Sequence, residues 1–133
     1  MKNRFSLLLT ALMLCFTLQL NAQNKNAKPF VIPELREWVG ATGEFEITEA
    51  TKVVYSKSQP AVANVANQFV FDYRKMTGTS LKFVEGKAGK GDILISIKNN
   101  KKLGTEGYKV TIGNNVKVEA TTERGAIWAT RTL

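Results

Sequence analysis

Two short runs of alternating side chains near the C-terminal end constrain the fold most strongly. Residues 107–112 and residues 116–120 each alternate apolar and polar side chains, and Gly113, Asn114 and Asn115 separate them. Two such runs, joined by residue types that tolerate a positive φ, predict a β-hairpin with one face in water. The opposite, apolar face of this hairpin then has to be covered by other elements of the chain.

A helix is the strongest prediction for the middle of the chain. It is expected to begin near Ser58 or Gln59, because Pro60 suits the first turn of a helix. Lys75 in the last turn and Gly78 just beyond it are typical of a helix C-terminus. Apolar residues recur at steps of three and four and predict one buried stripe. These residues are Val62, Val65, Ala66, Phe69, Tyr73 and Met76.

A second helix is predicted directly after the hairpin. Thr121 and Thr122 offer an N-cap, Glu123 is favourable in a first turn, and residues 126–129 continue the helix. The chain stops at Leu133 without a C-cap glycine or a polar tail. This ending leads us to expect that the chain is the front part of a longer protein.

Further strands are predicted on either side of the first helix, at residues 44–48, 52–56, 81–85 and 92–97. The last of these is apolar on both faces, which is typical of a central strand. Residues 86–91 are rich in glycine and lysine and are interpreted as a hairpin tip. The order of elements predicts an α+β fold, a two-layer sandwich. Its single mixed or mostly antiparallel sheet of about five strands carries two packed helices.

The first 22 residues have the pattern of a signal peptide. A basic start with Lys2 and Arg4 precedes an apolar stretch, and Ala22 before Gln23 suits cleavage. The apolar stretch is short for a membrane span, so no stable span is expected. Cys15 follows Leu14, which is bulky for a lipoprotein signal, so lipidation is the lesser alternative. We expect an exported protein that is periplasmic, outer-membrane-associated or secreted, with residues 23–30 as a flexible leader and residues 31–133 as one folded domain.

The charge of the chain does not point to nucleic acid. The formal charge is +8, but the lysines are scattered, and the one cluster at residues 98–102 has no interleaved aromatic side chains. A surface that tracks phosphates would group its charges with stacking rings. The chain also lacks histidine, which excludes serine–histidine and cysteine–histidine nucleophiles and histidine metal sites. We therefore expect no nucleic-acid partner, no cofactor and no metal.

Few residues remain as candidates for chemistry. Residues 86–91 lack the first glycine and the final serine or threonine of a phosphate-binding loop. Glycoside cleavage needs a pair of carboxyl groups, and the two aspartates, Asp72 and Asp92, are better explained as solvated or capping groups. Trp38, Tyr108 and Trp128 could form a sugar-stacking platform. For Tyr108 and Trp128, packing in the core or against a further domain is favoured.

Several short motifs, taken together, resemble the N-terminal domain of a known enzyme family. They are Glu106-Gly107-Tyr108-x-Val110-x-Ile112, Val116-x-Val118-x-Ala120, Gly125-Ala126-Ile127-Trp128-Ala129-Thr130-Arg131-Thr132-Leu133, and, near the start, Val31-Ile32-Pro33 and Gly43-x-Phe45-x-Ile47. In this order they resemble the small non-catalytic domain of family 20 glycoside hydrolases, the exo-β-N-acetylhexosaminidases. The resemblance covers about residues 30–133, and the last helix of such a domain leads into a catalytic (β/α)8 barrel.

The resemblance implies an activity that this chain does not carry by itself. Family 20 enzymes remove terminal N-acetylglucosamine or N-acetylgalactosamine by substrate-assisted, retaining hydrolysis. The acetamido oxygen of the substrate attacks, an Asp orients it, and the adjacent Glu protonates the leaving oxygen. No Asp-Glu dipeptide occurs in this sequence. We therefore expect no catalytic residue in this chain, an inactive fragment, and a catalytic barrel of the same polypeptide as its partner, through which it meets amino-sugar glycans.

Two alternatives stay open at this point. Family 84 β-N-acetylglucosaminidases have a similar front domain and a similar lead into their barrel. A stand-alone periplasmic binding module, with no enzyme attached, is the other alternative. The downstream sequence would distinguish these possibilities.

Overall fold

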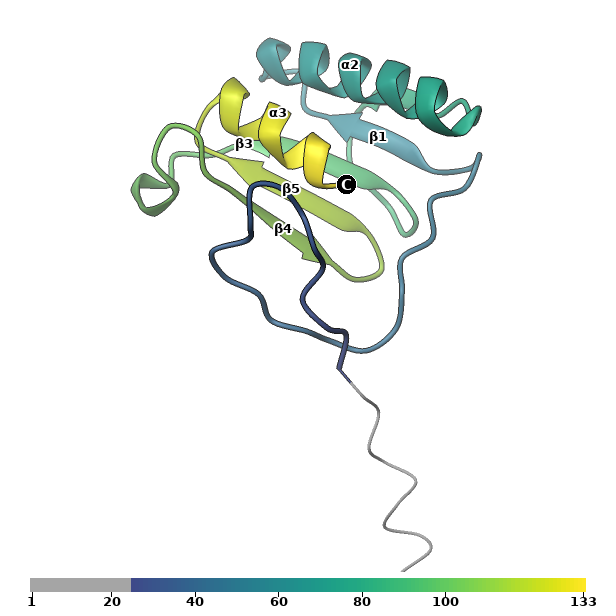
Figure 1. Ribbon diagram of the computed structural model, residues 1–133. Coiled ribbons are helices and arrows are strands. Elements are labelled where there is room, and N and C mark those ends of the chain that lie inside the picture. The colour runs from purple at the N-terminus through teal and green to yellow at the C-terminus, as the bar shows by residue number, and fades with distance from the viewer. Residues whose placement is uncertain (1–24) are drawn as a thin grey trace, which may run out of the picture. The chain divides into compact units, whose positions relative to one another are not determined.

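The computed structural model describes residues 25–133 (Figure 1). The predicted signal peptide and Cys15 lie outside these residues. The chain divides into two compact units, and the boundary falls between Gly43 and Glu44. The second unit, residues 44–133, contains every helix and strand that the structure describes.

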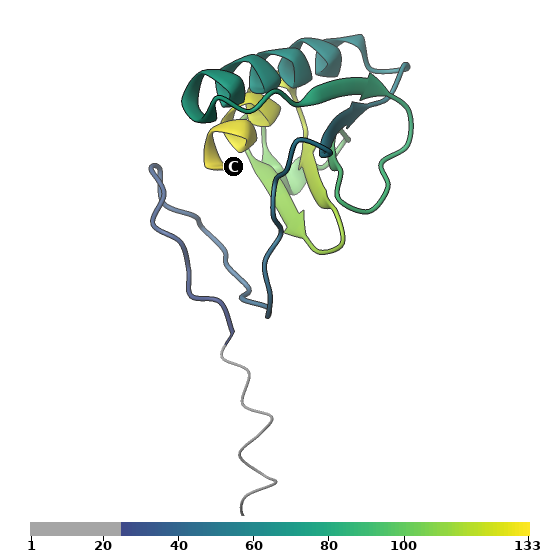
Figure 2. The same ribbon diagram turned by 90° about the vertical axis from the view of Figure 1, so that its right-hand side faces the viewer.

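The second unit is an α+β fold built on one five-stranded sheet. Its elements are β1 (Lys52–Tyr55), α2 (Pro60–Thr77), β2 (Lys82–Glu85), β3 (Ile93–Ile97), the 3-10 turn η2 (Lys101–Leu103), β4 (Tyr108–Ile112), β5 (Val116–Ala120) and α3 (Glu123–Thr132). The strand order is β2-β1-β3-β5-β4. Both helices lie on the same side of the sheet (Figures 1 and 2). This arrangement confirms the predicted two-layer sandwich.

The sheet is mixed, and most of its pairs are parallel. β1 pairs in parallel with β2 and with β3, and β3 pairs in parallel with β5. Only the predicted hairpin, β4 with β5, is antiparallel. β3 lies in the middle of the sheet, as its two apolar faces predicted. The mixed character was therefore predicted correctly, whereas the alternative of a mostly antiparallel sheet is wrong.

The core lies between the sheet and the two helices. It contains Val53, Ile93, Ile95, Val116 and Val118 from the sheet, together with Val62, Val65, Ala66 and Phe69 from α2, and Ala126 and Ala129 from α3. Each of these side chains is at most 2% exposed. Because side chains alternate along a strand, the residues between these core positions face the other side of the sheet.

Helix α2 forms where the sequence predicted it. Pro60 occupies the first turn, and Gly78 ends the helix with a φ of 77°, a left-handed conformation that glycine adopts without strain. Four of the six residues in the predicted stripe are buried and Tyr73 is partly buried. Met76 is the exception, because 74% of its surface is exposed. The expected stripe is therefore about one turn too long.

Helix α3 is fixed by a cap and by a close backbone contact. The Thr122 hydroxyl accepts a hydrogen bond from the Gly125 amide at 3.3 Å, as expected for an N-cap. Gly125 is buried, and a Cβ atom at this position would lie 2.7 Å from the carbonyl oxygen of Gly107. Glycine is required here because α3 lies directly against the chain that leads into β4.

Three predicted local structures differ from those observed. Residues 44–48 form no strand, although Phe45 and Ile47 pack against the core as their alternation implied. In the β4–β5 turn, none of Gly113, Asn114 and Asn115 has a positive φ. Residues 86–91 connect two strands that both pair with β1, so this loop is a crossover and not a hairpin tip.

The described part of the first unit, residues 25–43, has no helix or strand. Val31-Ile32-Pro33, one of the motifs that carry the family resemblance, therefore lies outside any strand. The Asn26 amide donates a backbone hydrogen bond to the Ala41 carbonyl at 2.7 Å, and the Asn26 side chain donates to the Gly43 carbonyl at 2.7 Å. These bonds join the two ends of the segment.

Candidate interface on the helical face

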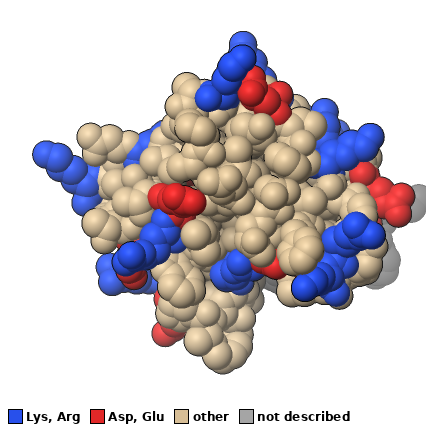
Figure 3. All heavy atoms as spheres, turned by 90° about the horizontal axis from the view of Figure 1, so that it is seen from above, with Lys and Arg blue, Asp and Glu red and all other residues tan. Residues whose placement is uncertain are grey.

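Large apolar side chains are exposed on the two helices. Phe71 and Met76 of α2 are 52% and 74% exposed, and Ile127 and Trp128 of α3 are 36% and 46% exposed. Figure 3 views the molecule from the side of α2, and most of its centre consists of uncharged residues with lysines and arginines mainly around the edge. We call the outer surface of α2 and α3 the helical face.

One ion pair joins the two helices. Arg131 of α3 donates from Nη1 to Oδ2 of Asp72 at 2.5 Å, and Gln68 donates from Nε2 to Oδ1 of the same carboxylate at 2.9 Å. The hydrogen bond from Arg131, followed by that from Gln68, lowers the pKa of Asp72 below its ordinary value. Asp72 is therefore an ionised anchor for α3, and no second carboxylate shares these contacts.

A cation also lies on the helical face beside an aromatic ring. The Lys75 Nζ atom is 4.6 Å from the centre of the Phe71 ring, within the range of a cation–π contact. This contact holds the lysine side chain over the ring at the surface of α2. The predicted position of Lys75 in the last turn is thus confirmed, and its side chain is exposed.

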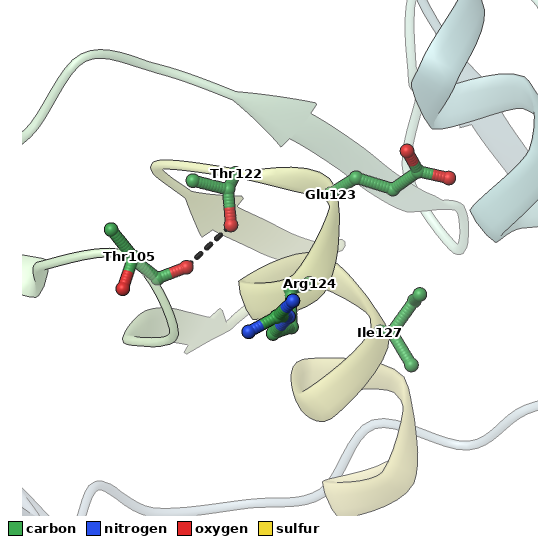
Figure 4. Close-up of a pocket in the computed structure, with 5 residues that line it drawn as sticks. All are labelled: Thr105, Thr122, Glu123, Arg124 and Ile127. Atoms are coloured by element: carbon green, nitrogen blue, oxygen red, sulfur yellow. Dashed lines mark hydrogen bonds between the residues drawn. The ribbon is translucent and has the colours of Figure 1, made fainter.

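A shallow hollow of about 610 Å³ lies at the start of α3. Thr105, Thr122, Glu123, Arg124 and Ile127 line it, and the Thr122 hydroxyl donates to the Thr105 carbonyl (Figure 4). The Glu123 side chain extends away from the two threonines. Because the lining contains a single carboxylate, this hollow lacks the pair that glycoside cleavage requires.

Asp92 is a structural carboxylate. It is 3% exposed, and Oδ2 accepts a hydrogen bond from the Gly89 amide at 2.8 Å while Oδ1 accepts one from the Lys52 amide at 3.3 Å. The Lys52 ammonium lies 3.7 Å away. Asp92 therefore links the crossover loop to the start of β1. This agrees with the predicted role as a capping carboxylate, whereas the alternative of a solvated carboxylate does not fit its burial.

Of the three aromatic candidates, Tyr108 and Trp128 belong to the second unit and Trp38 to the first. Tyr108 packs against the core, and its hydroxyl is 2.6 Å from the Thr132 hydroxyl. Trp128 belongs to the exposed helical face. Trp38 lies in the first unit, where its indole nitrogen donates to the Asn26 carbonyl at 3.2 Å. Core packing is thus confirmed for Tyr108, whereas Trp128 is not a core residue.

Residues 25–133 contain no group of three or more histidine, cysteine, aspartate or glutamate side chains that could hold a metal ion. Within the same range, no helix combines the length and the apolar character needed to cross a membrane. The sequence reasoning missed the Asp72–Arg131 pair, because the two residues are 59 positions apart. Only the packing of α3 beside α2 brings them together.

Comparison with known proteins assigns this fold to a family. Residues 28–133 match the family model for glycosyl hydrolase family 20, domain 2. The chain is also 31% identical over 109 residues to the lacto-N-biosidase of Bifidobacterium bifidum. This match covers 80% of the chain but only 10% of the length of that relative. The match to domain 2, which spans the whole sheet and both helices, shows that the chain belongs to glycosyl hydrolase family 20.

Proposed function

We propose that this chain is the accessory N-terminal domain of an exported β-N-acetylhexosaminidase. In this proposal a catalytic barrel of the same polypeptide removes terminal N-acetylglucosamine or N-acetylgalactosamine by substrate-assisted, retaining hydrolysis. The match to domain 2 of family 20 supports the proposal, and it favours family 20 over the family 84 alternative. The basic start and apolar stretch of residues 1–22 support export.

The helical face is the observation that carries this proposal. Phe71, Met76, Ile127 and Trp128 are large apolar side chains exposed on these two helices, and such side chains are commonly covered by a partner surface. We propose that the catalytic barrel covers this face, with Trp128 as the central contact. Leu133, which follows α3, is not part of this contact, because it packs partly against the core of its own domain.

The carboxylates of the described residues support a non-catalytic role. Asp72 is held by Arg131 and Gln68 on the helical face, and Asp92 is held in the crossover loop on β1. Each carboxylate is thus used in a structural contact, with Asp72 bonded to Arg131 and Gln68 and Asp92 bonded to the Gly89 and Lys52 amides. The proposed chemistry therefore belongs to the barrel, where an Asp-Glu dipeptide would act.

Hydrolysis by two purified proteins tests this proposal. One is the chain alone, and the other is the chain joined to its downstream sequence. We expect nitrophenol release from nitrophenyl β-N-acetylglucosaminide only from the joined protein. A nitrophenyl lacto-N-bioside should be assayed in parallel, because the relative is named a lacto-N-biosidase. A joined protein that hydrolyses neither compound would refute the proposed activity.

Substitutions on the helical face test the docking step. Phe71→Ser with Trp128→Ser should lower the melting temperature of the joined protein by several degrees, because both side chains would lose a buried contact. Ile112→Ser is the control, because Ile112 is also 52% exposed but lies at the end of β4. Equal shifts from the double variant and from the control would place the barrel on another surface.

A further inference from the structure

The sheet carries a concentration of lysines on the face opposite the helices. The strand register places Lys52 beside Lys82, Lys109 beside Glu119, and Lys117 beside Thr111. All of these positions alternate with the core residues of their strands, so they face away from α2 and α3. Lys98, which follows β3 directly, bonds to Glu119 and therefore lies on this face too.

The positive charges on this face exceed the negative ones. Lys52 pairs with buried Asp92, and Lys98 pairs with Glu119. Lys82, Lys109 and Lys117 form no ion pair within residues 25–133, and all three are exposed. Unpaired lysines on neighbouring strands raise the local positive potential, which attracts anions.

Three of these lysines gather around one carboxylate. The hydrogen bond from Lys98, together with the charges of Lys98, Lys109 and Lys117, lowers the pKa of Glu119 below its ordinary value. Glu119 thus stays ionised at neutral pH and offsets one of the three charges. We call Lys98, Lys109 and Lys117 the lysine cluster, and its excess positive charge remains available to a ligand.

A hollow of about 180 Å³ lies beside two members of the lysine cluster, Lys98 and Lys109. The two lysines line it together with Asn99, Asn100, Leu103, Glu119 and Ala120. The Asn100 side-chain oxygen is occupied by the Lys102 amide at 3.2 Å, which leaves its NH₂ group as a donor. Ammonium and amide donors therefore line this hollow beside the single carboxylate of Glu119, and such donors match the acceptor oxygens of an anionic group.

We infer that the lysine cluster binds a carboxylate or sulfate group of an acidic polysaccharide. The choice of a polysaccharide rests on the proposed function, in which the barrel of the same protein acts on glycans. An anchor on this face would hold a charged glycan while both helices stay covered by the barrel. The face would then raise the local concentration of substrate near the enzyme.

The side chains of this face do not suit the other polyanions. None of the strand residues that face this side is aromatic or an arginine, so the stacking contacts of single-stranded nucleic acid have no counterpart. Val54 is only 1% exposed, and its neighbours Val84 and Leu94 are partly buried, so the face has no prominent apolar side chain to insert into a lipid surface.

Titration calorimetry with the purified chain tests this inference. The probes are polygalacturonate for carboxylates, dextran sulfate for sulfates, neutral dextran, and an oligothymidine. We expect binding to one or both acidic polysaccharides, weakening as salt rises, and no binding to neutral dextran. Lys109→Gln with Lys117→Gln should weaken binding by about tenfold or more. Glu119→Gln should strengthen binding, because the variant removes the negative charge that offsets the lysine cluster.

A charge-matched control separates the cluster from the overall charge. Lys87→Gln with Lys90→Gln removes two exposed lysines of the crossover loop and should change the affinity by less than about twofold. Equal loss in the two double variants, absent binding to both acidic probes, or tighter binding to oligothymidine would overturn the inference. Hydrolysis of the small nitrophenyl substrate by the joined protein should be unchanged in Lys109→Gln/Lys117→Gln. If the joined protein with its natural lysines does not hydrolyse this substrate, the result contradicts the proposed function and leaves the inference about the lysine cluster standing.

Discussion

Arg131 and Asp72 form the link between the two helices of the domain. The guanidinium Nη1 atom lies 2.5 Å from Oδ2 of the carboxylate, and the side chains are 42% and 22% exposed. The pair bridges α3 and α2 at the surface, in addition to the core contacts that Ala126 and Ala129 of α3 make.

The Asp72–Arg131 pair predicts a pH dependence of stability. The pKa of Asp72 is lower in the folded chain than its ordinary value of 3.8. A lowered pKa contributes stability that is present above this ordinary value and is lost as the pH falls through the folded value. Asp72→Asn should thus lower the melting temperature at pH 7, and the difference from the unmodified chain should shrink below about pH 3.8.

A double-mutant cycle checks the assignment of this effect. Arg131→Gln should lower the melting temperature at pH 7, and adding it to Asp72→Asn should cost little more, because the two side chains share one interaction. If the melting-temperature losses of the two single variants simply add up in the double variant at pH 7, Asp72 and Arg131 do not interact in solution.

The buried face of α2 predicts unequal costs for two substitutions. Phe69 is 2% exposed in the core, so Phe69→Ala should lower the free energy of unfolding by about 3–5 kcal/mol through lost burial and a residual cavity. Lys75→Ala should cost well under about 1 kcal/mol, because Lys75 is exposed. Urea melts of the two variants measure this difference, and equal midpoints would mean that the helix face is assigned wrongly.

The contact between Gly125 and Gly107 predicts an unusual response to alanine. In an exposed helix, replacing glycine by alanine usually stabilises by about 1 kcal/mol. Here the new Cβ atom would lie 2.7 Å from the Gly107 carbonyl oxygen, so α3 would have to move. Gly125→Ala should therefore lower the melting temperature. Asn67→Ala on the exposed side of α2 should leave it unchanged or raise it, and a stabilising Gly125→Ala would contradict the observed packing of α3.

Local patterns predicted most elements of the fold. Pro60 and Gly78 bounded α2, Thr122 capped α3, and the alternation of residues 116–120 placed Val116 and Val118 in the core. These signals depend on neighbours in the sequence, and for this reason they could be interpreted without the structure. The exposure of Met76 could not be predicted in this way, because it depends on tertiary packing and not on the spacing of apolar residues.

Pairing between distant segments could not be predicted from these patterns. β1 joins β2 and β3 in parallel, so residues 86–91 form a crossover whose sequence resembles that of a turn. Phe45 and Ile47 alternate like strand residues, yet no partner strand binds their backbone. The lysine cluster likewise depends on register, since Lys98, Lys109 and Lys117 come from three separate segments.

Assaying the purified chain for hydrolysis of nitrophenyl β-N-acetylglucosaminide tests the central claim most directly. The claim is that this domain is non-catalytic and that Asp72 and Asp92 serve the structure. We predict no nitrophenol release above the buffer control from the chain alone, while the same assay detects release from the chain joined to its barrel. Hydrolysis by the isolated chain that disappears in Asp72→Asn or Asp92→Asn, with the fold intact by circular dichroism, would contradict the claim.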